Sequence, residues 1–66
     1  MLNTIKKARL LAGITQRQLA DSVGVSTVTV SKWERGIMFP NVQRLKIVAD
    51  SLNTTVEMLI SDREVS

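Results

Sequence analysis

The chain has 66 residues, of which 44% are hydrophobic, and its formal net charge is +3. This length suffices for one small domain over residues 1–66, and the composition is that of a globular rather than a disordered chain. Cysteine and histidine are both absent, which excludes disulfide bonds, zinc sites built on thiolates or imidazoles, and catalysis by a cysteine nucleophile or a histidine base.

The spacing of the apolar residues predicts five short helices and no strand, so the expected fold class is all-α. Glycine, proline and asparagine interrupt the helical patterns and set the expected boundaries. In chain order, the helices are expected over about residues 3–12, 16–23, 27–35, 42–51 and 56–61.

Capping side chains support these boundaries. The expected N-terminal caps of the second, third and fourth helices are Thr15, Ser26 and Asn41. Gln18 follows the first of these caps by three residues and completes a capping box. The fifth helix can start at Thr54 or Thr55, and Thr54 with Glu57 would form a second capping box.

The first helix is expected to bury one face. Its inward apolar stripe is predicted to consist of Leu2, Ile5, Ala8 and Ala12. Arg9 falls within this stripe, and Glu34 falls on the inward side of the third helix. Since a lone charge on an apolar face is costly unless it is paired, Arg9 and Glu34 are predicted to meet in a structural ion pair.

Residues 16–35 combine the features that point to a function. Leu19 faces inward from the first of their two helices, and Val30 and Trp33 face inward from the second. Gly24 can supply the positive φ of a three-residue turn, and two helices joined by so short a turn cross at a steep angle. One face of the second helix then stays exposed, and a helix fits the major groove of B-DNA.

The run TQRQLADSVGVSTVTVSKWERG resembles the helix-turn-helix of the phage repressor and Cro family, the lambda-repressor-like or XRE group. The segment PNVQRLKIVADSLNTTVEMLI continues the resemblance, which covers about residues 2–61. The resemblance implies a compact five-helix domain with its helix-turn-helix at about 16–35, made of a first motif helix at 16–23 and a recognition helix at 27–35. It also implies a sequence-specific transcriptional regulator, a repressor that binds a palindromic operator in double-stranded DNA as a homodimer.

The outward face of the recognition helix holds the expected base contacts. A valine can pack against a thymine methyl group, and a lysine can donate to O6 and N7 of guanine. Side chains at the similar positions of the family approach base edges, which implies base contacts from Thr27, Val28 and Lys32. The family position similar to Gln16 holds a DNA phosphate and braces the first residue of the recognition helix. Further candidate contacts to the DNA backbone are Arg17, Ser26, Ser31, Arg35 and Arg44.

Three apolar residues depart from the family pattern. Ile37, Met38 and Phe39 stand in the loop where the family often has polar or basic residues. One hypothesis is that this loop forms a protein interface, such as a dimer surface shared with Ile47, Met58 or Ile60. The alternative is that Phe39 folds back onto the core.

Charge is distributed unevenly along the chain. Residues 1–46 hold eight basic and two acidic side chains, whereas residues 47–66 hold one basic and four acidic side chains. This split suits a polyanion on one side, and ordinary solvated charge is the alternative. No apolar run approaches the length of a membrane span, and basic residues interrupt the start where a secretory signal would be apolar, so we expect a cytoplasmic protein without membrane contact.

Other functions remain open at this stage. The same pattern suits a stand-alone Cro-like regulator, a restriction–modification controller protein, an antitoxin, or the N-terminal domain of a longer repressor. A protein-binding module with this fold, as in some antitoxins, is the alternative from another class. An enzyme is disfavoured because no nucleophile has a plausible base, and we expect no metal, cofactor or small-molecule ligand.

Overall fold

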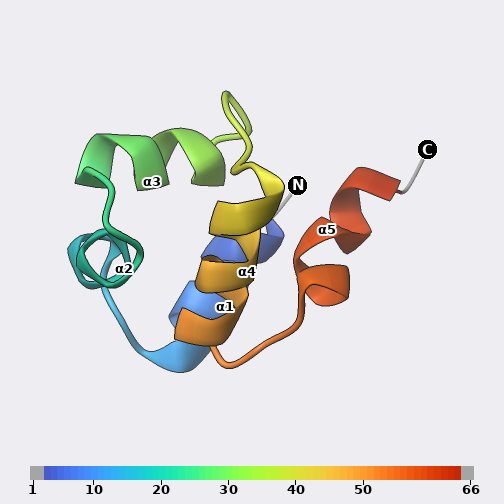
Figure 1. Ribbon diagram of the computed structural model, residues 1–66, viewed down its shortest axis with the longest axis horizontal. Helices are drawn as coiled ribbons and strands as arrows, with labels where there is room; N and C mark the ends of the chain where they lie inside the picture. Colours follow the sequence, from blue (N-terminus) through green and yellow to red (C-terminus); the bar gives the residue numbers. More distant parts are fainter. Residues whose placement is uncertain (1–2, 65–66) are drawn as a thin grey trace.

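The computed structural model describes the backbone of residues 3–64 and the side chains of residues 3–60. Within this part of the chain the structure is all-helical, as predicted (Figure 1). The five helices are α1 (Thr4–Ala12), α2 (Gln16–Val23), α3 (Thr27–Glu34), α4 (Val42–Ser51) and α5 (Val56–Glu64). The predicted end of the third helix was wrong by one residue, because Arg35 is the C-cap of α3 rather than a helical residue. The fifth helix extends beyond its predicted end at residue 61.

Side-chain caps fix the starts of the central helices. Thr15 Oγ1 accepts from the backbone amide of Gln18 at 3.0 Å, and the Thr15 amide donates to Gln18 Oε1 at 2.8 Å, which confirms the capping box. Ser26 Oγ accepts from the amide of Thr29 at 3.1 Å, and Asn41 Oδ1 accepts from the amide of Arg44 at 2.9 Å. These bonds satisfy amides that have no partner inside their helices.

The cap of α5 is one of the two residues at which the sequence allowed this helix to start. Thr55 Oγ1 accepts from the backbone amide of Met58 at 3.2 Å, so Thr55 is the capping residue. A capping box needs the glutamate three residues after the cap, and Glu57 is only two residues after Thr55. Of the two starts that the sequence allowed, the structure therefore confirms Thr55, and the capping box that would accompany a start at Thr54 does not form.

Left-handed residues terminate the helices. Asn53 has φ +54°, and the amide that follows it, of Thr54, donates to the carbonyl oxygen of Ala49 at 2.9 Å. Gly36 has φ +76°, and the next amide, of Ile37, donates to the carbonyl oxygen of Lys32 at 3.0 Å. This Schellman pattern turns the chain sharply away from each helix end.

The core is made of small and medium apolar side chains around one tryptophan. Its most deeply buried members are Trp33, Ile5, Leu19, Leu59, Val30 and Val48. Trp33 is thus a core residue, as the sequence predicted. The α4 residues Leu45 and Ala49 are also buried, whereas Phe39 covers the cluster from the α3–α4 loop.

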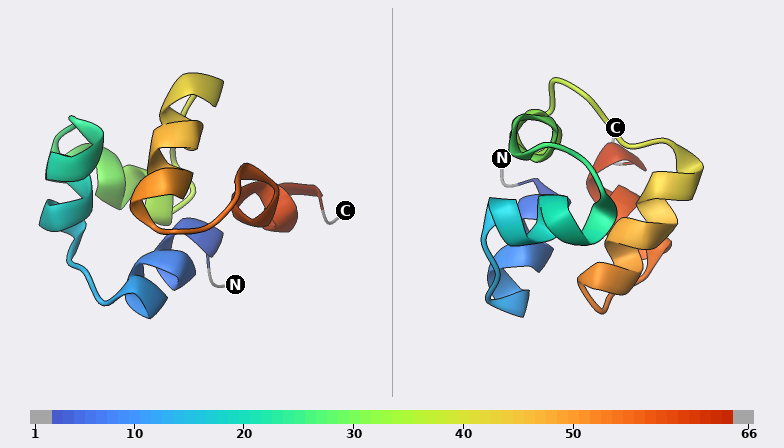
Figure 2. Two further views of the ribbon diagram at one scale, coloured as in Figure 1. Left: turned by 60° about the horizontal axis from the view of Figure 1, so that its bottom comes forward. Right: turned by 60° about the vertical axis from the view of Figure 1, so that its left-hand side comes forward.

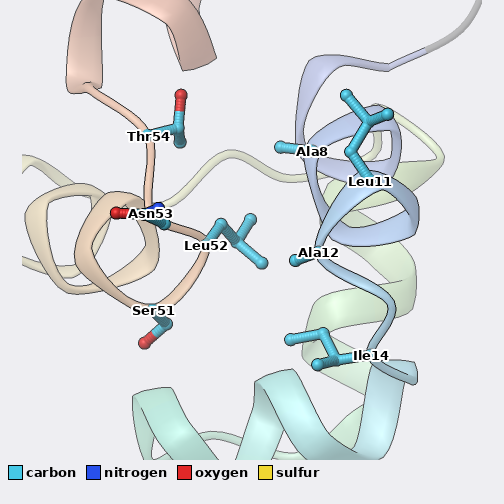
Figure 3. Close-up of a pocket in the computed structure, with 8 residues that line it drawn as sticks. All are labelled: Ala8, Leu11, Ala12, Ile14, Ser51, Leu52, Asn53 and Thr54. Carbon is cyan, nitrogen blue, oxygen red and sulfur yellow. The ribbon is translucent and has the colours of Figure 1, made fainter.

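The predicted stripe of α1 was only partly right. Ile5 is buried and Ala8 is half-buried, but Ala12 is exposed, and Leu2 lies outside the described residues. Ala12 is at the last turn of α1, where it lines an open groove opposite Leu52 and the α4–α5 connection (Figure 3). The groove separates Ala12 from these residues, so the periodic pattern continues there without direct packing.

The arrangement of the helices leaves α3 at one edge of the molecule. In Figure 1, α3 lies across the view while α2 is seen nearly end-on, so the two helices cross steeply. In the right-hand view of Figure 2, α3 is seen nearly end-on and α2 lies across the view, which shows the same steep crossing. α1 packs against α3 and α5, and α4 packs against α2 and α5. The connections between α1 and α2 and between α4 and α5 lie toward the edge opposite α3 (Figure 1).

Candidate nucleic-acid interface

The segment 16–35, to which the sequence analysis assigned the function, consists of α2, a short turn and α3 with its C-cap. Leu19 and Ala20 of α2 are buried in the core together with Val30 and Trp33 of α3. Gly24 has φ +83°, and the amide of the following residue donates to the carbonyl oxygen of Ala20 at 3.0 Å. The small side chain of Ala20 leaves room for the two helices to approach. The geometry is that of a helix-turn-helix.

α3 has two contrasting faces. Val30 is 0% exposed, whereas Val28, on the opposite side, is 62% exposed. Thr27 is exposed, and Lys32 and Ser31 are half-buried. α3 begins with four β-branched residues in a row, which are not strong helix formers, so the helix depends on its Ser26 cap and on core packing. An exposed valine adds nothing to that packing and is available for an external contact.

The side chains predicted to contact phosphates differ in their exposure to solvent. Arg17 and Arg35 are exposed, and Arg44 is half-buried at the first turn of α4. Ser26 is exposed, but its hydroxyl is also engaged locally with the Thr29 hydroxyl at 3.0 Å. Of the three arginines predicted to contact phosphates, Arg17 and Arg35 are therefore more accessible to an anionic partner than Arg44.

Gln16 is positioned differently from the expectation. Its side chain is half-buried, and its Nε2 donates to Glu34 Oε1 at 3.0 Å. The hydrogen bond of the Gln16 side chain thus runs to the C-terminal end of α3, whereas the resemblance implied a brace for Thr27 at its start. A primary amide carries two N–H donors, so this bond leaves one donor for another acceptor.

Arg9 and Glu34 meet, as the sequence predicted. Arg9 Nε donates to Glu34 Oε2 at 2.6 Å, and Arg9 Nη2 donates to Glu34 Oε1 at 3.1 Å. Arg9 Nη1 also donates to the carbonyl oxygen of Ile14 at 2.9 Å. The two side chains are 10% and 3% exposed. This two-point pairing locks α1 to the end of α3 and to the chain that enters α2.

Sequence reasoning missed the role of Asn3. Its Oδ1 accepts from the amides of Ile5 at 2.8 Å and Lys6 at 3.3 Å, so Asn3 caps α1. Its Nδ2 donates to the carbonyl oxygen of Trp33 at 2.9 Å. An asparagine directly before a helical apolar pattern is an N-cap signal, so the cap could have been found. The contact with Trp33 could not.

The apolar loop after α3 divides into two parts. Phe39 packs against the core, as one of the two hypotheses stated. Ile37 and Met38 are exposed, at 59% and 48%, and their amides both donate to the carbonyl oxygen of Lys32. The loop is therefore held close to the end of α3 with two apolar side chains facing outward.

The described part of the chain contains neither a metal-binding cluster nor a membrane-spanning helix. Among those residues, no group of three or more His, Cys, Asp and Glu side chains is placed to hold a metal ion. None of the helices there has the length and apolar character needed to cross a membrane. The groove of Figure 3 is lined by alanine, leucine, isoleucine, serine, asparagine and threonine, none of which is ionisable near neutral pH.

A steeply crossed helix pair with one outward face on the second helix defines a helix-turn-helix domain. In agreement with this geometry, a family model described as helix-turn-helix matches residues 5–59. The chain belongs to this family.

Two curated proteins are similar to the chain. One, an HTH-type transcriptional activator, BcrR, from Enterococcus faecalis, is 34% identical over 61 residues, which are 92% of this chain and 30% of that protein. The other, the cryptic phage CTXphi transcriptional repressor RstR from Vibrio cholerae serotype O1, is 36% identical over 45 residues, which are 68% of this chain and 40% of that protein. The matched segments thus cover less than half the length of either relative. No solved structure was found to match it.

Proposed function

We propose that this chain is the sequence-specific DNA-binding domain of a transcriptional regulator, with α3 as the recognition helix in the major groove. The observation that carries the proposal is the contrast on α3 between Val28, which is 62% exposed, and Val30, which is fully buried. The fold holds the inner face rigidly and leaves the outer face free for the base edges. Both curated relatives are named as transcriptional regulators.

The proposed contacts follow from the chemistry of that outer face. Val28 packs against a thymine methyl group, Lys32 donates to O6 and N7 of guanine, and Thr27 contacts a base at the start of the helix. The half-buried Lys32 can lie along the protein with its methylene groups while its ammonium group reaches the groove. The proposed backbone contacts are Gln16, Arg17, Ser26, Ser31, Arg35 and Arg44.

We further propose that two copies bind one palindromic operator. A single recognition helix covers only a few base pairs, and half-sites of such dimers lie one helical turn, about 34 Å, apart. One copy measures 32 × 22 × 22 Å, so two copies side by side can place their α3 helices at about this spacing. The bound dimer would repress transcription in the cytoplasm by excluding the polymerase from the promoter. It would act by binding and not by catalysis.

The deciding experiment is selection of binding sequences from random duplex DNA with the purified chain. The expected result is a palindromic consensus with half-sites one turn apart and an affinity that falls steeply with salt. A pool that stays random after repeated selection, with the protein folded, would contradict sequence-specific binding. A consensus that contains one half-site without its repeat would contradict only the proposed dimer, and sequence-specific binding would stand.

A second candidate is a protein-binding module, as in an antitoxin. The specific observation in its favour is the exposed pair Ile37 and Met38, because such apolar side chains in a loop are typical of protein interfaces. A partner protein that binds the chain equally well with and without excess duplex DNA would support this function. A restriction–modification controller protein would instead behave as the DNA-binding proposal requires.

A further inference from the structure

The carboxylate of Glu34 is shared between two side chains from two other segments. Its Oε1 accepts from Arg9 Nη2 at 3.1 Å and from Gln16 Nε2 at 3.0 Å. Arg9 belongs to α1, Gln16 opens α2, and Glu34 closes α3. Glu34 Oε1 therefore links the Arg9–Glu34 ion pair to Gln16, the first residue of α2.

The negative charge of Glu34 is neutralised locally by the Arg9 guanidinium group. Arg9 engages both carboxylate oxygens, so the pair carries no net charge next to a surface that would face DNA phosphates. An uncompensated carboxylate at this point would repel a phosphate, whereas a compensated one can serve as an anchor for a neutral donor. Gln16 is such a donor, and its amide has a second N–H.

The place of Gln16 suits a phosphate. It is the first residue of α2, where backbone amides without helical acceptors and the helix dipole favour an anion. Thr15 Oγ1 accepts from the amide of Gln18. Among the described residues, the amides of Gln16 and Arg17 have no backbone acceptor outside the helix ladder. A free glutamine side chain would sample many rotamers here, but the bond to Glu34 selects one.

We propose that Glu34 is a positioning residue for a phosphate contact made by Gln16. Arg9 holds Glu34, Glu34 Oε1 holds one N–H of the Gln16 amide, and the other N–H donates to a phosphate oxygen of the DNA. This inference rests on the proposed function, and it makes the phosphate contact dependent on the docking of α3 against α1 and α2. The ion pair then contributes to DNA affinity as well as to folding.

A double-mutant cycle tests the proposal. Glu34→Asp keeps the charge that pairs with Arg9 but withdraws the carboxylate from Gln16 by one methylene group, and Gln16→Ala removes the phosphate donor. Each single variant should bind duplex DNA roughly 3-fold to 10-fold more weakly, whatever the DNA sequence, as for the loss of one hydrogen bond. In the Gln16→Ala background, Glu34→Asp should cause no further loss, because the group that it positions is absent.

The controls separate positioning from misfolding. Glu57→Asp makes the same change at an exposed position of α5 and should leave DNA affinity unaltered. Circular dichroism at the assay temperature establishes that each variant is folded. A folded Glu34→Asp variant with wild-type affinity, or one with the same loss in both backgrounds, would overturn the proposal. If Gln16→Ala binds as the wild type does, the inference fails while DNA binding stands; if the wild type binds no DNA, the proposed function itself fails.

A measurement on the unaltered chain provides a second test that needs no variant. The two amide protons of the Gln16 side chain should differ in NMR solvent exchange, with one protected in the free protein. The second should gain protection when duplex DNA is added. Equal and rapid exchange of both protons in the free protein would contradict the bond to Glu34, and a second proton that stays unprotected on DNA would contradict the phosphate contact.

Discussion

Asn3 and Trp33 join the start of α1 to the end of α3, because Asn3 Nδ2 donates to the carbonyl oxygen of Trp33 at 2.9 Å. The neighbouring residue Glu34 is joined to α1 through Arg9. α1 therefore holds the end of α3 at two successive residues, one through the backbone and one through a side chain. These bonds and the burial of Trp33 hold α3 against α1, in addition to its packing on α2.

Removing the cation of the buried pair should destabilise the fold. Arg9→Ala leaves the Glu34 carboxylate buried without its partner, and the expected loss in the free energy of unfolding is about 3–5 kcal/mol. The measurement is urea or thermal unfolding followed by circular dichroism. Arg17→Ala, at an exposed arginine, is the matched control and should change stability by less than about 0.5 kcal/mol. An unchanged melt of Arg9→Ala would refute the structural role of the pair.

The two roles of Asn3 can be separated by two substitutions. Asn3→Ala removes both the cap and the donor to Trp33 and should cost about 1–2 kcal/mol of stability. Asn3→Asp keeps an acceptor for the first amides of α1 but loses the donor. It should therefore be more stable than Asn3→Ala and less stable than the wild type. If Asn3→Asp unfolds at the same urea concentration as the wild type, the bond to Trp33 contributes nothing measurable.

Val28 and Val30 should respond oppositely to the same substitution. Val28→Ala removes an exposed side chain and should leave stability within about 0.5 kcal/mol, while the preference for thymine at one base position weakens. Val30→Ala opens a cavity in the core and should cost about 2 kcal/mol of stability. Unfolding curves and binding to single-base variants of the selected site measure both effects. A Val28→Ala variant that keeps its full sequence preference would remove Val28 from the proposed base contacts.

Lysine and arginine side chains around α3 should differ in what they contribute to DNA binding. Lys32→Ala should cost about 1–3 kcal/mol at the selected site and relax the preference at one base position. Arg35→Ala should weaken binding to all sequences alike and reduce the salt slope by about one unit. Titrations at several salt concentrations, on the selected site and on unrelated duplex, distinguish the two patterns. An unaltered consensus selected by Lys32→Ala would show that this lysine does not read a base.

The sequence by itself determined the helical elements, because their signals are local. The Thr15 box, the caps Ser26 and Asn41, and the stop at Asn53 each depend on residues within one turn of one another. Burial was predictable where periodicity was strong, as for Val30 and Trp33. The errors lie at helix ends, in the inward place given to Ala12 and the last residue of α3, and the sequence left the start of α5 open between Thr54 and Thr55. Periodicity does not resolve a helix boundary to one residue, and the exposure of Ala12 depends on how closely the α4–α5 connection approaches it.

Only the tertiary structure decided which oxygen atoms the side-chain amides of Gln16 and Asn3 contact. The pairing of Arg9 with Glu34 was predictable since two buried charges of opposite sign must be compensated. The bonds from Gln16 to Glu34 and from Asn3 to Trp33 were not, because a half-buried amide can be satisfied by water or by any nearby oxygen. Which oxygen it meets is fixed by how α1, α2 and α3 are packed against one another.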